Sequence, residues 1–147
     1  MRFGYPQLLV VLQFGLIVLM ILFVIYLQAF FSLLALFIFS LGIAMGIWAI
    51  KMHPSGNFRI VPELKEDCTL VTKGIYRHIR HPMYASVILM QLGIVLFHPT
   101  WYQWLMWLLL IGVLWLKASR EERLWITHDT CYKEYKARTK YFIPYIL

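Results

Sequence analysis

Long apolar runs alternate with short polar segments along this chain. Four such runs cover residues 8–27, 29–50, 83–97 and 101–116. About 20 apolar residues in a helix match the hydrocarbon thickness of a bilayer. The link around Gln28 and the turn His98–Thr100 are both short, so the runs on either side of each should return antiparallel. The pattern predicts an all-α integral membrane protein with four transmembrane helices arranged as two helical hairpins, in a single domain over residues 1–147.

Composition supports the same class. Of the 147 residues, 61% are hydrophobic and only 14% are charged, whereas a soluble domain carries about 25% charged residues. The net charge of +7 comes from basic residues that flank the apolar runs. Basic residues in such places are typical of topology signals and lipid-headgroup contacts. We therefore expect the bilayer, and no nucleic acid, among the partners.

The basic residues are distributed asymmetrically. Residues 51–80 hold six Lys and Arg and the stretch from Lys117 onward holds seven, while the tips around Gln28 and Thr100 hold none. Cytoplasmic loops carry the excess of positive charge. The sequence thus predicts a multi-pass protein with both termini, segment 51–82 and segment 117–147 in the cytoplasm. The small size and minimal loops favour a prokaryotic inner membrane.

Gly42 and Gly46 lie four residues apart in the second apolar run. Small residues at this spacing let two helix backbones approach closely. We interpret the pair as a helix-packing feature.

The two polar segments should meet at the membrane surface, because the second hairpin returns the chain to its starting side. One segment carries Arg, His and Tyr residues before residue 84, and the other carries Lys117 and Glu121, one helical turn apart. A carboxylate beside such a cluster can hold a zwitterionic small molecule. Alternatively, Arg77, Arg80 and Glu121 are interfacial charges that pair with lipid phosphates or with one another.

Three motifs favour the first interpretation, a ligand-binding site: Leu-Val-Thr-Lys-Gly-Ile-Tyr at residues 70–76, Arg-His-Pro-Met-Tyr at residues 80–84, and Glu121-Glu122. Together they resemble the isoprenylcysteine carboxyl methyltransferase and phospholipid methyltransferase superfamily. The resemblance implies a membrane enzyme that uses S-adenosyl-L-methionine as its methyl donor. It implies a lipophilic or lipid-modified acceptor, either an isoprenylcysteine carboxylate or a phospholipid amine or thiol.

The resemblance also implies specific site residues. Those that would bind S-adenosylmethionine are Cys68, Thr69, Leu70, Val71, Tyr76, His81, Pro82, Met83, Tyr84 and Glu121. Lys117 and Arg80 would position the substrate, and no side chain would take part in the methyl transfer itself. Lys117 stands where the family commonly has Arg, and Lys lacks the bidentate fork of Arg. This departure weakens the case for a prenylcysteine carboxylate as the substrate.

Other functions are also compatible with the sequence. Sterol reductases that use NADPH have a related Arg-His-x-x-Tyr element, although Pro82 and the Glu-Glu pair favour methyl transfer. A non-enzymatic membrane protein that binds lipid or metal is the second alternative. His78-x-x-His81 and His128-x-x-Cys131 offer potential zinc ligands at a common spacing. Because His81 already belongs to the methyltransferase pattern, we predict no metal site.

Overall fold

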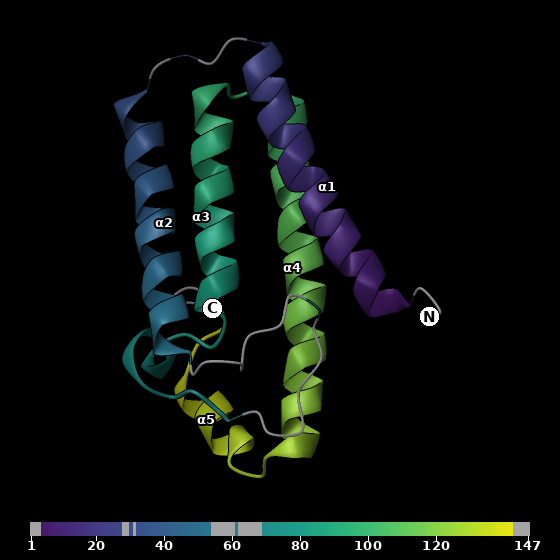
Figure 1. Cartoon of the computed structure of the whole chain (residues 1–147), viewed down its shortest axis with the longest axis vertical. Helices are drawn as coiled ribbons and strands as arrows, with labels where there is room; N and C mark the ends of the chain where they lie inside the picture. The colour runs from purple at the N-terminus through teal and green to yellow at the C-terminus, as the bar shows by residue number, and fades with distance from the viewer. Residues whose placement is uncertain (1–3, 28–29, 31, 54–60, 62–68, 143–147) are drawn as a thin grey trace.

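The computed structural model describes residues 4–27, 30, 32–53, 61 and 69–142. Within these residues the fold is helical, apart from one isolated bridge between Ile79 and Lys140. The elements are α1 (Tyr5–Tyr26), α2 (Leu33–Met52), the 3-10 helix η1 (Gly74–Arg77), α3 (Pro82–Phe97), α4 (Trp101–His128) and α5 (Tyr132–Arg138). The four long helices run lengthwise (Figure 1), and the end of α1, the start of α2 and the α3–α4 connection lie at one end of the bundle. The segment before α3 and helix α5 lie at the other end.

Among the residues that the structure describes, three helices are long and apolar enough to cross a bilayer. These are α1, α2 and α4, with mean hydropathies of 3.1, 2.4 and 1.3 over their most apolar windows. Large apolar side chains on α1 and α2 point outward, as Leu22 and Phe37 do with 55% and 65% of their surfaces exposed. Water does not tolerate so much exposed apolar surface, whereas lipid does. The chain is therefore a membrane protein.

The expectation of four full spans is met only in part. Helix α3 is apolar but has 16 residues, fewer than the roughly 20 that a perpendicular span needs. The second and fourth helices also differ in extent from the predicted apolar runs. The second helix begins at Leu33 rather than at residue 29, because the Ser32 side chain accepts a hydrogen bond from the Ala35 N–H at 3.2 Å and caps the helix there. The fourth helix continues past the apolar run to His128, as the helix-forming residues that follow Lys117 predict.

The predicted first hairpin is wrong as a packing unit. Although α1 and α2 are joined at one end, α2 packs chiefly against α3, and α1 packs chiefly against α4. The α2–α3 contact is close because both helices present glycine there. A Cβ atom on Gly42 would lie 2.7 Å from the Met90 nitrogen, and one on Gly93 would lie 2.7 Å from the Phe39 Cβ. The packing role predicted for Gly42 is thus confirmed.

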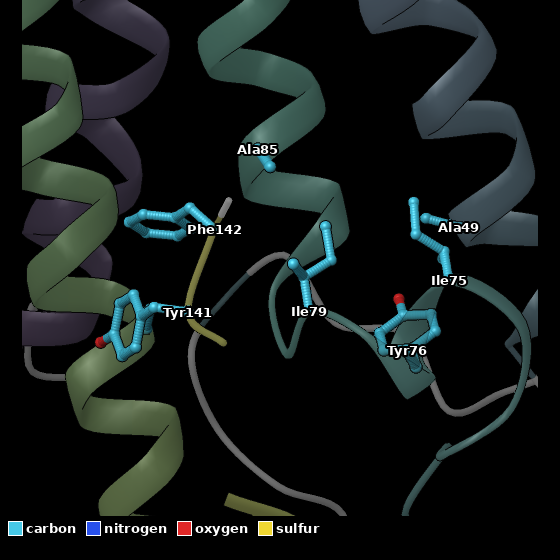
Figure 2. Close-up of a cluster of buried hydrophobic side chains, with 8 residues drawn as sticks. Ala49, Ile75, Tyr76, Ile79, Ala85, Tyr141 and Phe142 are labelled. Carbon is cyan, nitrogen blue, oxygen red and sulfur yellow. The ribbon is translucent and has the colours of Figure 1, made fainter. Parts of the chain in front are cut away.

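A buried cluster at the polar end of the bundle joins segments that are far apart in sequence. It contains Ala49, Ile75, Tyr76, Ile79, Ala85, Ala118, Tyr141 and Phe142. Figure 2 shows Phe142 and Tyr141 on the C-terminal segment near α3 and α4, while Ile75 and Tyr76 lie towards α2. The predicted meeting of the two polar segments is confirmed, and this cluster is what holds them together.

Candidate functional site

The Gly-x-Tyr motif forms a tight turn that buries its tyrosine. Gly74 has φ +60, a conformation that side-chain-bearing residues rarely adopt. It opens η1, in which Ile75 and Tyr76 are buried. A Cβ atom on Gly74 would also lie 2.7 Å from the Met52 sulfur at the end of α2. Glycine is required here for both its conformation and the close approach of α2, and it places Tyr76 in the polar-end cluster.

The Arg-His-Pro motif is held by the C-terminal segment. The Arg80 N–H donates to the Lys140 carbonyl at 2.8 Å, and the His81 N–H donates to the Tyr141 carbonyl at 3.2 Å. The Lys140 N–H donates back to the His78 carbonyl at 3.0 Å. These bonds satisfy backbone hydrogen-bonding groups of the motif just before α3 begins. They fix where the first turn of α3 lies relative to α4.

The start of α3 offers hydrogen-bond donors. Pro82 occupies the first helical position and has no N–H, and the Ala85 N–H donates to the His81 carbonyl. The N–H groups of Met83 and Tyr84 belong to the first turn, where a helix supplies no carbonyl to accept them. Such groups, with the positive end of the helix dipole, suit an anion.

The carboxylate of Glu121 lies at the centre of the site. It accepts a hydrogen bond from the Tyr84 hydroxyl. Its second oxygen lies 3.7 Å from His81 Nδ1, and the His81 and Tyr84 rings stack with their centroids 5.7 Å apart. The side chain of Glu121 keeps 21% of its surface exposed, so a ligand can reach it. The His-Pro-x-Tyr and Glu-Glu motifs therefore converge on one accessible carboxylate.

Glu122 faces a different set of partners and is buried. Its carboxylate lies 2.6 Å from Arg80 Nε, 2.7 Å from Lys136 Nζ and 3.4 Å from His81 Nε2. Sequence reasoning gave this residue little weight. Its position beside Glu121 and the charge of Arg80 were the available signals, but the partner on α5 could not be identified from spacing alone.

Arg80 is occupied by these structural contacts. Besides Glu122, its guanidinium donates to the carbonyls of Lys136 and Thr139, and it lies 5.2 Å from the centroid of the Tyr141 ring. Arg80 thus ties the start of α3 to α5 and the segment after it. Its role in positioning a substrate stays a prediction.

Lys117 lies inside the bundle, although the sequence placed its ammonium at the membrane boundary. Only 1% of the residue is exposed. Its Nζ donates to Gln13 Oε1 of α1 at 2.6 Å and lies 5.2 Å from the centroid of the Tyr84 ring. Lys117 is therefore part of the Glu121 site. Sequence reasoning missed Gln13 as a member of this site, since nothing in the spacing predicts that α1 packs on α4.

Buried tyrosines line the site below α3. The Tyr135 hydroxyl donates to the Tyr76 carbonyl at 2.7 Å. Burial raises the pKa of Tyr76 and of Tyr135 well above the usual range, and it raises the pKa of Tyr141 to about 12. All three are neutral phenols at physiological pH. They supply aromatic faces and hydroxyl groups without adding negative charge.

The residues predicted to bind S-adenosylmethionine fall into three groups. His81, Tyr84 and Glu121 contact one another directly, and Pro82 and Met83 continue the same turn of α3. Tyr76 lies in the polar-end cluster, and Val71 packs against that cluster. Thr69 and Leu70 are in the irregular segment before η1, and Cys68 lies outside the described residues.

Neither His-x-x-His nor His-x-x-Cys gathers into a metal site. Over the described part of the chain, no group of three His, Cys, Asp or Glu side chains is arranged to hold an ion. The site is instead a carboxylate beside an ammonium, aromatic rings and free backbone donors. This set can bind a zwitterion that carries additional positive charge.

The chain is also similar to a known protein family. A family model described as phospholipid methyltransferase matches residues 30–129, which contain α2, α3 and α4 in full. No curated protein matches the chain. The matched region includes Tyr76, Tyr84 and Glu121, whereas α1 and α5 lie outside it.

Proposed function

The chain belongs to the phospholipid methyltransferase family, and we propose that it transfers a methyl group from S-adenosylmethionine to a lipophilic acceptor in the membrane. The observation that carries the proposal is the contact between Tyr84 and Glu121. It joins the two motifs that the resemblance assigns to cofactor binding, at the polar end of a membrane bundle. The residues around that contact also suit the charges of the cofactor.

Each charged part of S-adenosylmethionine has a fitting partner in this site. The Glu121 carboxylate suits the ammonium of its methionyl group. The N–H groups of Met83 and Tyr84 suit its carboxylate. The rings of Tyr84 and Tyr76 suit its sulfonium and its adenine. When bound, the cofactor supplies a methyl group activated by the sulfonium and leaves as the neutral thioether S-adenosylhomocysteine.

The protein's own contribution is to orient groups and to exclude water. Tyr84 and His81 hold the Glu121 carboxylate in one direction, so little reorganisation accompanies ligand binding. The polar-end cluster closes the site on the side of α2 and the C-terminal segment. Methyl transfer depends on in-line approach and on a dry site more than on acid–base help. We infer that these residues contribute by orienting the ligand and excluding water, and that none of them acts as a catalytic base.

We propose that Lys117 holds an anionic group of the acceptor. Its ammonium lies near the Tyr84 ring and one helical turn from Glu121, close to the cofactor site. An acceptor lipid would enter laterally from the bilayer and present its polar head to this ammonium. Attraction between opposite charges is stronger inside an apolar bundle than in water, because little water screens the interaction.

Methyl-transfer assays with labelled S-adenosylmethionine test the proposal. The acceptors are a prenylcysteine, phosphatidylethanolamine and a small thiol, with NADPH-dependent sterol reduction as a parallel assay. We expect transfer to at least one lipid acceptor and no NADPH oxidation. Lys117→Met should reduce transfer at least tenfold, because it removes a charge-assisted contact. Lys117→Arg should retain activity and improve transfer to the prenylcysteine carboxylate, since Arg restores a bidentate contact. Transfer by Lys117→Met at the wild-type rate would refute the role of Lys117.

A further inference from the structure

The C-terminal segment (residues 139–142) contacts both helices that carry the candidate site, although it lies outside the matched region 30–129. Its backbone pairs with the residues before α3, since the His81 N–H donates to the Tyr141 carbonyl at 3.2 Å. Figure 2 shows the Tyr141 side chain extending from this segment towards α4, where a hydrogen bond of 2.9 Å joins its hydroxyl to that of Ser119. Tyr141 therefore connects the start of α3 to α4.

Tyr141 is held on α4 at both its ring and its hydroxyl. Trp115 lies one helical turn before Ser119, and the centroid of its ring is 4.5 Å from that of Tyr141. The Phe142 ring packs edge-on against the same tryptophan, with centroids 6.1 Å apart. A buried tyrosine whose apolar face and polar tip both have partners is fixed in its orientation.

On its other side Tyr141 packs against His81. The two ring centroids are 5.1 Å apart, and His81 also stacks with Tyr84. These rings enclose an imidazole whose Nδ1 lies 3.7 Å from Glu121 and whose Nε2 lies 3.4 Å from Glu122. In a close-packed environment a ring cannot turn without displacing its neighbours. Tyr141 thus helps to fix the edge that His81 presents to Glu121.

The two halves of the site belong to different helix pairs. His81 and Tyr84 lie at the start of α3, which packs chiefly against α2. Glu121 lies on α4, against which α1 chiefly packs. A link between these pairs at the polar end fixes the distance between the two halves. Tyr141 forms such a link, because it is bonded to α4 and packed on the residue that precedes α3.

We propose that Tyr141 is a positioning residue for cofactor binding: bonded to Ser119, it holds the His81 ring in place against the Glu121 carboxylate. This inference rests on the proposed function. It extends the S-adenosylmethionine site beyond the matched family region to the C-terminal segment. Tyr141 acts through His81, so its effect is on the geometry of the carboxylate that binds the ligand.

Calorimetric titration of S-adenosylhomocysteine into hydroxyl-deletion variants tests the inference. Tyr141→Phe and Ser119→Ala should each weaken binding about fivefold, the value of one hydrogen bond. The double variant should bind no more weakly than either single variant, because both changes remove the same contact. Ser119→Thr keeps a hydroxyl and should bind as wild type does. Independent losses that multiply in the double variant would contradict a shared contact.

Tyr132→Phe is the matched control. Tyr132 is a buried tyrosine of α5 whose ring stacks with that of Trp125, with centroids 6.0 Å apart. The substitution removes the same atom from the same end of the molecule, so it reports any general loosening of the C-terminal region. We expect it to bind S-adenosylhomocysteine as wild type does. Affinities of Tyr141→Phe and Ser119→Ala equal to that of Tyr132→Phe would overturn the inference.

A second readout does not depend on the cofactor. In the nuclear magnetic resonance spectrum of the unliganded protein, Ser119→Ala should shift the ring resonances of His81, because Ser119 is bonded to Tyr141 and Tyr141 packs on His81. If wild type binds no S-adenosylhomocysteine, the proposed function fails, and the His81 resonances alone decide the positioning role. A shift no larger than that in Tyr132→Phe would refute it.

Discussion

At the scale of single residues, two adjacent carboxylates have separate tasks because a helix turns by about 100° per residue. Glu121 faces Tyr84 and remains partly exposed, whereas Glu122 is buried against Arg80 and Lys136. The first is suited to a ligand and the second to holding the site together. The Glu-Glu pair thus combines a partly exposed carboxylate with a buried, ion-paired one.

Glu122→Ala should destabilise the protein. It leaves the Arg80 guanidinium largely buried without its carboxylate, and breaking a buried ion pair costs about 3 kcal/mol of the free energy of unfolding. Thermal unfolding in detergent measures the effect. Glu134→Ala, which removes an exposed carboxylate from α5, is the matched control and should change little. Equal melting temperatures for the two variants would contradict the structural role of Glu122.

The sequence predicted the convergence of the motifs better than the contacts that support them. The motifs that contain Tyr84 and Glu121 were identified together, and the structure brings those two side chains into contact. The partners Gln13 and Lys136 were missed, because each comes from a helix whose packing no local pattern specifies. A motif carries information about its own residues, whereas a supporting contact depends on how distant helices meet.

At the scale of helices, glycines allow α2 and α3 to pack backbone against backbone. A Cβ atom on Gly42 would lie 2.7 Å from the Met90 nitrogen and 2.9 Å from the Ser86 oxygen, both of which are backbone atoms that cannot turn aside. The spacing of Gly42 and Gly46 predicted a close contact. It could not predict that α3, rather than the neighbour α1, supplies the partner surface. Because α3 carries Pro82 and Tyr84 at its start, this contact also locates the candidate site.

Gly42→Ala should therefore lower the melting temperature, and Gly112→Ala should not. The first forces α2 and α3 apart, and overpacking of this kind costs about 1–3 kcal/mol. A Cβ atom on Gly112 of α4 meets nothing within 4 Å, and alanine is the better helix former by about 1 kcal/mol. Thermal unfolding of both variants in the same detergent provides the comparison. A Gly42→Ala protein as stable as Gly112→Ala would show that the helices do not approach as described.

At the scale of the whole molecule, the chain is a helical membrane bundle with its candidate site at the polar end. Its apolar runs allowed the helices and the meeting of the polar segments to be predicted, because bilayer thickness and helical rise set the length of a span. The pairing of α1 with α4 was not predictable, since helix association within lipid depends on fine packing rather than on hydrophobicity. We expect the polar end, which gathers the basic segments, to face the cytoplasm.

Cysteine labelling tests that orientation. Cys131 is exposed at the polar end, between α4 and α5. A membrane-impermeant maleimide applied to intact cells should leave it unmodified, and the same reagent should modify it after permeabilisation. A cysteine introduced at Trp101, which follows the α3–α4 connection and is 77% exposed, is the control and should react in intact cells. Modification of Cys131 in intact cells would reverse the proposed orientation.

The central claim is that Glu121 binds a methyl-donor cofactor, and calorimetric titration of S-adenosylhomocysteine into the detergent-solubilised protein tests it most directly. We expect Glu121→Gln to bind about ten- to a hundredfold more weakly than wild type, because a charge-assisted hydrogen bond contributes about 1.5–3 kcal/mol. Glu134→Gln makes the same change at an exposed carboxylate of α5 and should bind as wild type does. Equal affinities for wild type and Glu121→Gln, or no binding by the wild-type protein, would contradict the claim.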